Sequence, residues 1–333
     1  MVVTKERDIG LDIIRSVAIL CVVCGHFFSV NTPFNDVPLV GISMIFQGFL
    51  KSIFCNLGVP FFLMLSGYLC CKKEFSLGYY KGLKRILVPY LVISLITWGV
   101  LSSDYSLVEL LKGVFGFKII GYAWYIEMYL GLFLLMPFVN IVIRVVCESN
   151  DKYLLWALIA TSILLTSLPT IVSRQGNVFL SRYWEMNFPI TFYLIGAYIK
   201  IFQPQLSWKY LLPAIFILSF DLIISVLFGG GELLNFTGAY YGLVNMAAVY
   251  ILFVLFYQIK TTPCRTVITS ISMCSLEMYL FSFVIDKTLY PVIIGCFYTT
   301  QSEFLFWFVP ITCCLLILDY VCAKVLRQII NSM

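Results

Sequence analysis

Apolar residues in this chain form long blocks that are separated by short polar connections. Most blocks hold about 20 residues, the length that an α-helix needs to cross the ~30 Å hydrocarbon core of a bilayer. Because that core offers no water to backbone N–H and C=O groups, each block is expected to be a helix. The pattern predicts an all-α, polytopic membrane protein of about ten transmembrane helices, at residues 11–30, 42–70, 85–103, 121–146, 152–170, 187–203, 209–228, 237–258, 267–288 and 303–325.

The amino-acid composition agrees with this pattern. Of the 333 residues, 61% are hydrophobic and 12% are charged, about half the charged fraction of a soluble domain. The first apolar block follows Lys5 and Arg7, as in a secretory signal peptide, but it contains His26 and no small-x-small cleavage site follows it. We therefore expect it to stay as the first transmembrane helix. The twelve cysteines lie mostly in or beside apolar blocks, where a free thiol behaves as a small apolar group, and no disulfide framework is expected.

Lysine and arginine are distributed unevenly between the two sides of such a protein. With ten spans both termini lie on one side, and 16 of the 22 basic residues would lie there, against six on the other side. By the positive-inside rule that side is the cytoplasm. We expect a multi-pass membrane protein with both termini cytoplasmic. The net charge of +5 then reflects topology and does not indicate a nucleic-acid partner.

His26 is the single histidine of the chain and lies well inside the first expected helix. An ionisable residue within a bilayer costs roughly 2.5–3.5 kcal/mol or more and usually has a function or a partner. The alternative is a helix-end residue that water satisfies at the far interface. Arg15 precedes His26 by eleven positions, which places both side chains on one helix face, about 16 Å apart along the axis. Asp12 shares this face and can pair with Arg15, although Arg15 could instead simply anchor the helix at the interface.

A second basic cluster lies on the same side, between the second and third expected helices, and consists of Lys81, Lys84 and Arg85. Such a cluster suits an anionic ligand with several phosphates. Ordinary anchoring by contact with anionic lipid headgroups explains it equally well. Ser66 and Gly67, near the end of the second expected helix, are small and are expected to allow close approach of a neighbouring helix.

No metal site is expected. Cys21, Cys24 and His26 do not form a zinc site, because His26 lies about 200° around the helix from Cys24 and no other histidine could complete four ligands. The Cys-x-x-Cys spacing lies in the middle of an apolar helix, away from the helix N-terminus that activates redox thiols.

Several of these stretches, taken in order, resemble the acyltransferase-3 family of integral membrane acyltransferases, of the surface polysaccharide O-acetyltransferase type. Arg15 and His26 match its Arg/Lys-x10-His signature, in a context similar to its Asp-x-x-Arg-x-x-Ala opening. Residues 61–68 resemble its Phe-Phe to Ser-Gly-Phe/Tyr segment, residues 80–89 its basic Arg-Ile-x-x-Pro stretch and residues 123–126 its Trp-Phe/Tyr-Leu start of a later span. The family often has Tyr-x-x-His near the ninth span, where this chain has Ser282, so His26 must carry any imidazole chemistry alone.

The resemblance implies a single transmembrane acyltransferase domain over residues 1–333, in the bacterial cytoplasmic (inner) membrane. Such an enzyme moves an acyl group, acetyl by default, from cytoplasmic acyl-CoA to a hydroxyl of a cell-surface or lipid-linked glycan. Its expected partners are acyl-CoA (acetyl-CoA) as the donor, the glycan or lipid-linked sugar as the acceptor, and the lipid bilayer, with no metal and no nucleic acid. The chain ends soon after the tenth expected helix, so no fused soluble domain is expected.

Roles for individual residues follow from this resemblance together with side-chain chemistry. His26 is expected to remove the acceptor proton as a general base, with a covalent acyl-histidine as the alternative route. Asp12 is expected to orient Arg15. Arg15 and the cluster of Lys81, Lys84 and Arg85 are expected to hold the phosphates of CoA. The candidates on the substrate side are Trp124, Glu127 and Ser66.

Glu127 has three possible partners: a sugar hydroxyl, Arg174 or Arg182, or a neighbouring helix. The acids Glu277 and Asp286 in the ninth expected helix receive no role.

Two other classes of function stay open. A secondary transporter or lipid-linked glycan flippase would favour inverted repeats or broken helices, and the sequence reveals neither. A glycan polymerase would lead us to expect a large outer loop, whereas the outer loops are short.

Overall fold

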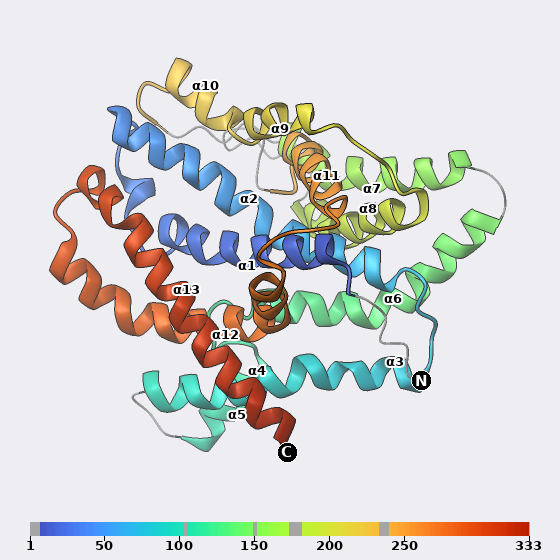
Figure 1. Cartoon of the computed structure of the whole chain (residues 1–333), viewed down its shortest axis with the longest axis horizontal. Helices are drawn as coiled ribbons and strands as arrows, with labels where there is room; N and C mark the ends of the chain where they lie inside the picture. Colours follow the sequence, from blue (N-terminus) through green and yellow to red (C-terminus); the bar gives the residue numbers. More distant parts are fainter. Residues whose placement is uncertain (1–6, 103–105, 149–151, 173–181, 233–239, 333) are drawn as a thin grey trace.

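The computed structural model describes residues 7–102, 106–148, 152–172, 182–232 and 240–332. Within these ranges the chain consists of helices and turns, with no strand, so the expected all-α fold is confirmed (Figure 1). The α-helices are α1 (Ile9–Ser29), α2 (Ile42–Cys70), α3 (Leu77–Tyr80), α4 (Lys84–Leu101), α5 (Leu107–Phe115), α6 (Trp124–Glu148), α7 (Lys152–Val172), α8 (Phe188–Phe202), α9 (Leu211–Leu218), α10 (Phe220–Phe228), α11 (Leu243–Tyr257), α12 (Arg265–Phe297) and α13 (Gln301–Ser332). Short 3-10 helices are η1 (Phe34–Asp36), η2 (Lys81–Leu83), η3 (Arg182–Asn187) and η4 (Trp208–Tyr210).

Every expected span falls on a helix, but the expected count of ten is not confirmed. Within the described part of the chain, six helical segments are long and apolar enough to cross a membrane: Ile9–Ser29, Ile42–Cys70, Leu77–Leu101, Trp124–Glu148, Arg265–Phe297 and Gln301–Ile330. A seventh would be the pair Trp208–Leu218 and Phe220–Phe228, which is bent by 46°. α8 and α11 have 15 residues each and so reach about 22 Å, short of a ~30 Å hydrocarbon core. Residue 103 and residues 237–239 of the expected spans lie outside the described ranges.

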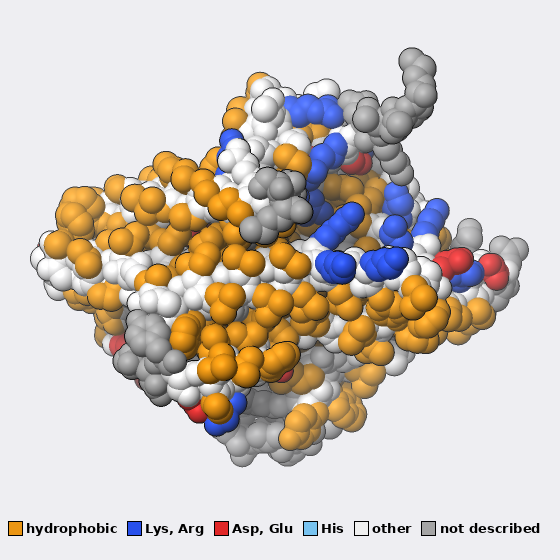
Figure 2. Space-filling model, turned by 90° about the horizontal axis from the view of Figure 1, so that it is seen from below, with side chains coloured by type: hydrophobic (Ala, Val, Ile, Leu, Met, Phe, Trp, Pro, Cys, Tyr) orange, Lys and Arg blue, Asp and Glu red, His pale blue; other side chains and the backbone are white. Residues whose placement is uncertain are grey.

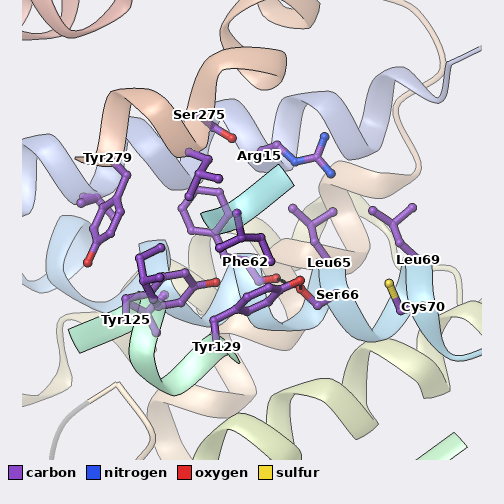
Figure 3. A pocket seen from close by; sticks show the side chains of 15 residues that line it. Arg15, Phe62, Leu65, Ser66, Leu69, Cys70, Tyr125, Tyr129, Ser275 and Tyr279 are labelled. Carbon is purple, nitrogen blue, oxygen red and sulfur yellow. Dashed lines mark hydrogen bonds between the residues drawn. The ribbon is translucent and has the colours of Figure 1, made fainter. Parts of the chain in front are cut away.

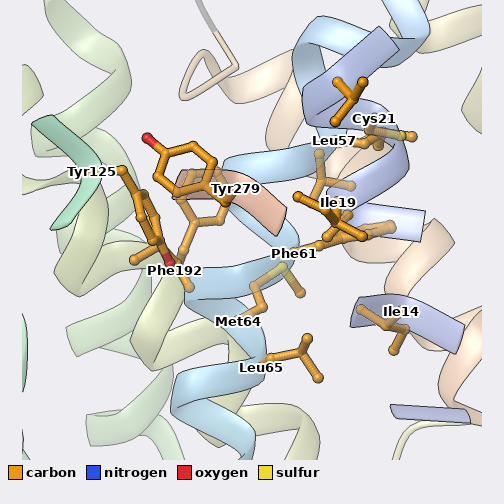
Figure 4. Packing of buried hydrophobic residues seen from close by; sticks show 14 of the residues in the cluster. Ile14, Ile19, Cys21, Leu57, Phe61, Met64, Leu65, Tyr125, Phe192 and Tyr279 are labelled. Atoms are coloured by element: carbon orange, nitrogen blue, oxygen red, sulfur yellow. The ribbon is translucent and has the colours of Figure 1, made fainter. Parts of the chain in front are cut away.

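α1 lies at the centre of the bundle and packs against α2, α11, α12 and α13 (Figure 1). Its buried side chains include Ile14 and Ile19, which are fully enclosed. Figure 4 shows Ile19 beside Leu57 and Phe61 of α2. The helix that carries Arg15 and His26 is therefore held on several sides by packed side chains, which fixes their direction in the molecule.

Glycines bring the backbones of α2 and α8 into direct contact. A Cβ atom added at Gly67 would lie 1.9 Å from the carbonyl oxygen of Tyr193, and one added at Gly196 would lie 2.0 Å from that of Met64. Van der Waals packing of this kind is a main source of helix association in lipid. The expected close approach at Gly67 is therefore confirmed. Ser66 has a different role, because its hydroxyl donates to the carbonyl of Phe62 at 2.9 Å and contacts the hydroxyl of Tyr129 at 3.2 Å.

Apolar side chains cover much of the surface in Figure 2, whereas Lys and Arg side chains gather around a hollow in one part of it. This division is expected of a protein whose helices are surrounded by lipid and whose helix ends meet water and charged headgroups. Exposed apolar side chains occur along most of the long helices, among them Leu95 of α4, Leu135 of α6 and Ile317 of α13.

Candidate active site

Asp12 lies near the start of α1 and is 2% exposed. Nε of Arg7 donates to its two carboxylate oxygens at 2.6 and 2.8 Å. The hydroxyl of Ser272, on α12, donates at 2.7 Å, and that of Thr269 donates at 3.2 Å. Nη1 of Arg15 is farther away, at 3.8 Å. The expected pair of Asp12 and Arg15 is thus present, but the closer cation is Arg7, which the sequence analysis had considered only as a charge near the terminus.

Arg15 is consequently only partly engaged by protein groups. Its Nη1 donates to the Ser272 hydroxyl at 3.1 Å, and Nη2 of Arg7 donates to the same hydroxyl at 3.1 Å. A guanidinium carries five N–H donors, and two such groups beside one carboxylate leave an excess of positive charge. An anion at this position would meet donors that are already held in place.

A cavity of about 220 Å³ extends from Arg15 into the bundle between α1, α2, α4, α6 and α12. Figure 3 shows the Arg15 side chain at one end and several hydroxyl groups along the walls. We call it the Arg15 cavity. Its walls are mostly apolar, so it suits a slender, largely uncharged chain that ends in an anionic group. The lining residues are Arg15, Val22, Val59, Phe62, Leu65, Ser66, Leu69, Cys70, Ile86, Tyr125, Ile126, Tyr129, Ser275, Leu276 and Tyr279.

The phenol rings of Tyr125 and Tyr279 line the Arg15 cavity on the side away from Arg15 (Figure 3). The ring centroids of Tyr125 and Tyr279 are 5.7 Å apart. The hydroxyl of Tyr279 donates a hydrogen bond to the carbonyl of Tyr122, in the turn before α6. His26 does not line the cavity. It follows the lining residue Val22 by one turn of α1, about 6 Å along the axis, and its ring lies 3.9 Å from that of Tyr122, the residue that accepts the hydrogen bond from Tyr279.

His26 belongs to a separate polar cluster that three segments of the chain build together: the end of α1, the turn before α6, and α12. Its ring centroid lies 3.9 Å from that of Tyr122. Its Nδ1 lies 3.7 Å from Oδ2 of Asp286, on α12. The same Oδ2 accepts hydrogen bonds from Nδ2 of Asn31 and from the hydroxyl of Tyr122, both at 2.9 Å. We call His26, Asn31, Tyr122 and Asp286 the His26 cluster.

The end of α1 places Asn31 in this cluster. The backbone N–H groups of Val30 and Asn31 both donate to the carbonyl of His26, at 3.1 and 3.0 Å. The hydroxyl of Thr32 donates to the carbonyl of Phe27 at 2.7 Å. These bonds satisfy carbonyls that a helix end otherwise leaves without partners, and they turn the chain back over the last turn of α1. The Asn31 side chain is therefore held beside the histidine that precedes it by five residues.

Most of the other expected site residues lie outside both the Arg15 cavity and the His26 cluster. Lys81, Lys84 and Arg85 are exposed at the start of α4, and the neighbouring Ile86, rather than any of the three, lines the Arg15 cavity. Trp124 is 45% exposed, and Glu127 is exposed.

Both Trp124 and Glu127 lie on α6, but the α6 residues that line the cavity are Tyr125, Ile126 and Tyr129. Of the three substrate-side candidates, Ser66 alone lines it. Arg174 and the side chain of Arg182, proposed partners of Glu127, lie outside the described part of the structure.

Sequence reasoning missed Asn31, Tyr122 and the phenols of the cavity. A signal was available for two of them, because Tyr125 and Tyr129 are spaced four residues apart and so share a helix face. Asp286 was recognised only as an acid inside an expected span. Ser282, at the position where the resembling family often has histidine, is fully buried and donates to the carbonyl of Tyr279 at 2.8 Å.

Comparison with known proteins gives one match. No curated protein and no solved structure matches the chain. One family model, described as an acyltransferase domain, matches residues 8–323. That range contains Asp12, Arg15 and His26, every helix that lines the Arg15 cavity and the four residues of the His26 cluster. The match confirms the resemblance found in the sequence: the chain belongs to the acyltransferase-3 family of membrane acyltransferases.

Proposed function

We propose that this acyltransferase moves an acyl group, acetyl by default, from cytoplasmic acyl-CoA to a hydroxyl of a cell-surface or lipid-linked glycan. The observation that carries the proposal is the alignment of two groups on α1. Arg15 stands at one end of an apolar cavity of about 220 Å³, and His26 lies on the same face of α1 just beyond the other end. A thioester donor with an anionic head and a long uncharged arm fits this arrangement.

The donor would bind with its phosphates near Arg15, where the excess of positive charge lies. Lys81, Lys84 and Arg85 are exposed on the same side of the bundle and would contribute longer-range attraction to a polyanion. The pantetheine arm would occupy the Arg15 cavity, among the side chains of Phe62, Leu65 and Tyr129. Ser66 and the tyrosines would offer hydrogen bonds to its amide groups.

Transfer would take place between the cavity and the His26 cluster. The acceptor hydroxyl attacks the thioester carbon while the imidazole of His26 takes the hydroxyl proton. The C–S bond then breaks, the CoA sulfur leaves with the bonding electron pair, and His26 returns the proton to it. The products are an O-acyl ester and free CoA thiol. For the thioester to reach His26, the Tyr125 and Tyr279 side chains must move aside.

The test is acyl-CoA consumption on membranes that contain the chain, measured as release of free CoA thiol from acetyl-CoA, with the His26→Ala variant as the matched control. Thiol release that depends on His26, together with an added mass of one acetyl group on the surface glycan in mass spectrometry, would support the proposal. Glycan movement across the membrane without thiol release would instead indicate a transporter or flippase. If neither the thiol signal nor the glycan mass differs between the chain and the variant, the proposed donor and acceptor are wrong.

A further inference from the structure

We propose that Asp286 is a positioning residue for His26: it holds the imidazole with its proton on Nδ1, so that Nε2 is free to accept the proton of the acceptor. The effect of Asp286 on the rate of acyl transfer rests on the proposed function. The structural part of the inference, the state of the imidazole, stands on the geometry of the His26 cluster and can be tested without any substrate.

The carboxylate of Asp286 is fixed before any ligand binds. It is 2% exposed, and Oδ2 accepts hydrogen bonds from Asn31 and Tyr122 at 2.9 Å each. Both donors are neutral, so they orient the carboxylate without neutralising it. Among the residues that the structure describes, His26 is the basic side chain within ion-pair distance of it, with Nδ1 at 3.7 Å from Oδ2.

Other charged and titratable groups near Asp286 do not take the place of His26. Lys287 is next to it on α12 but is exposed, and its ammonium lies over the ring of Phe283, 5.9 Å from the centroid. Tyr290, one turn further along α12, is a buried phenol and offers no positive charge to the carboxylate. A buried carboxylate is stable when a cation or hydrogen-bond donors face it, and an imidazole that gains a proton is the group placed to become that cation.

The separation of 3.7 Å is longer than a hydrogen bond. In enzymes without substrate, catalytic hydrogen bonds are often long and shorten when the substrate binds. A small rotation of the imidazole against the Tyr122 ring would bring Nδ1–H to the carboxylate. A buried carboxylate at this position selects one tautomer of a histidine and stabilises the imidazolium that forms during proton transfer.

His26 makes a direct test possible, because it is the single histidine of the chain. In the full-length protein labelled with ¹⁵N-histidine, the imidazole gives one pair of nitrogen signals. We expect a protonated Nδ1 and an unprotonated Nε2 near neutral pH, and we expect Asp286→Asn to produce the other tautomer or a mixture. Nε2 protonated in the native protein, or a spectrum that Asp286→Asn leaves unchanged, would overturn the proposal.

The second measurement is acetyl-CoA consumption, with KM and kcat determined separately. Asp286→Asn should lower kcat at least about tenfold, and by no more than the roughly 10²–10⁴-fold that loss of a general base costs, while KM for acetyl-CoA stays near its native value. Asp286→Glu, which keeps the carboxylate, should recover part of kcat. The matched control is Glu277→Gln, since Glu277 is a buried acid on the same helix, 7% exposed, that belongs neither to the His26 cluster nor to the lining of the Arg15 cavity.

Equal losses in Asp286→Asn and Glu277→Gln would reduce Asp286 to a structural role and overturn the proposal. If Asp286→Asn fails to insert, Tyr122→Phe removes one hydrogen bond to the carboxylate while keeping the acid. It should then shift the tautomer populations, and an unchanged spectrum in that variant would count against the proposal. The failure of the proposed function has a different signature: no CoA release from any variant, with the tautomer effect of Asp286 still present.

Discussion

Nε of Arg7 lies 2.6 Å from the carboxylate of Asp12, whereas Nη1 of Arg15 lies 3.8 Å from it. Asp12 therefore has its own cation, and Arg15 keeps most of its donors for the cavity that it borders. The three residues lie within nine positions of one another, yet they have different consequences for ligand binding. Arg7 acts on Asp12, and Arg15 faces the site that we assign to the phosphates.

Removing Arg7 should weaken acyl-CoA binding although Arg7 does not line the cavity. In Arg7→Ala the carboxylate of Asp12 loses its closest cation, and Arg15 becomes the nearest replacement. A guanidinium that is paired with a buried carboxylate has fewer donors and less net charge for an anion. Calorimetry with acetyl-CoA should show a higher Kd for Arg7→Ala, and the double variant Arg7→Ala with Asp12→Asn should regain affinity. If the double variant binds no better than Arg7→Ala, Asp12 does not compete for Arg15.

Arg15 itself should determine donor affinity. Arg15→Ala should raise the Kd for acyl-CoA, and Arg15→Lys should recover part of the loss if charge is sufficient without a bidentate fork. A combined alanine variant of Arg15, Lys84 and Arg85 should bind least. The measurement is equilibrium binding to the purified protein. Retained binding by the combined variant would mean that the basic cluster serves only to contact lipid headgroups.

His26 should separate chemistry from binding. His26→Ala should lower the rate of transfer by about 10²–10⁴-fold, as expected for a lost general base, and should leave acyl-CoA binding nearly unchanged, because the phosphates would lie some 16 Å away along α1. Binding and single-turnover transfer are measured on the same preparation, after normal insertion has been shown. A near-normal rate at saturating acyl-CoA would show that His26 is not the general base and would favour the alternative of a helix-end residue that water hydrates at the membrane interface.

Gly67 should be far less tolerant of substitution than a glycine on an open helix face. A Cβ atom at Gly67 would lie 1.9 Å from a backbone oxygen of α8, which cannot move aside as a side chain can. Overpacking of this kind costs at least about 1–3 kcal/mol, so Gly67→Ala should lower Tm and Gly67→Leu should prevent normal folding.

Gly99 of α4 is the matched control for Gly67, because no atom lies within 4 Å of its added Cβ. Gly99→Ala should leave Tm unchanged or raise it, since alanine is the better helix former. Equal Tm values for Gly67→Ala and Gly99→Ala would show that the close approach of α2 and α8 does not limit stability.

The topology proposed from the charge distribution predicts that residues 35 and 333 lie on opposite sides of the membrane. Reporter fusions at these two positions give the answer, because alkaline phosphatase is active outside the cytoplasm and a fluorescent protein inside it. Residue 333 is expected in the cytoplasm and residue 35 outside. Both reporters on the same side would contradict an even number of crossings and the placement of the donor at Arg15.

The pattern of apolar residues along the chain was sufficient to predict most of the helices. The apolar block at 42–70 has the bounds of α2, because lipid requires each segment to satisfy its own backbone hydrogen bonds. The common face of Asp12 and Arg15 also followed from helix geometry alone. Hydropathy could not give the number of crossings, since α8 and α11 are apolar along their lengths but only 15 residues long.

The candidate site was predictable only where it lies within one helix. His26 meets Tyr122 and Asp286, which are 96 and 260 positions away in the sequence, and no periodicity in α1 points to either. The position of Arg7 depends on how the chain enters α1, which a helical pattern that begins at residue 11 does not describe. Lys81, Lys84 and Arg85 could not be separated from ordinary anchoring residues, because contact with headgroups and contact with phosphates select the same side chains.

The Tyr125 and Tyr279 side chains, which lie between the Arg15 cavity and the His26 cluster, bear on ion flow across the membrane as well as on the reaction. If the donor and the acceptor come from opposite sides of the membrane, as proposed above, the enzyme must not become a conduit for protons and ions, because a cell depends on the gradients of both. The Tyr125 and Tyr279 rings, whose centroids are 5.7 Å apart, lie between the Arg15 cavity and Tyr122 of the His26 cluster, and the hydrogen bond from Tyr279 to the carbonyl of Tyr122 holds Tyr279 there. On this view the acyl group passes while electrolytes do not, and replacing either ring with alanine would be expected to depolarise the membrane.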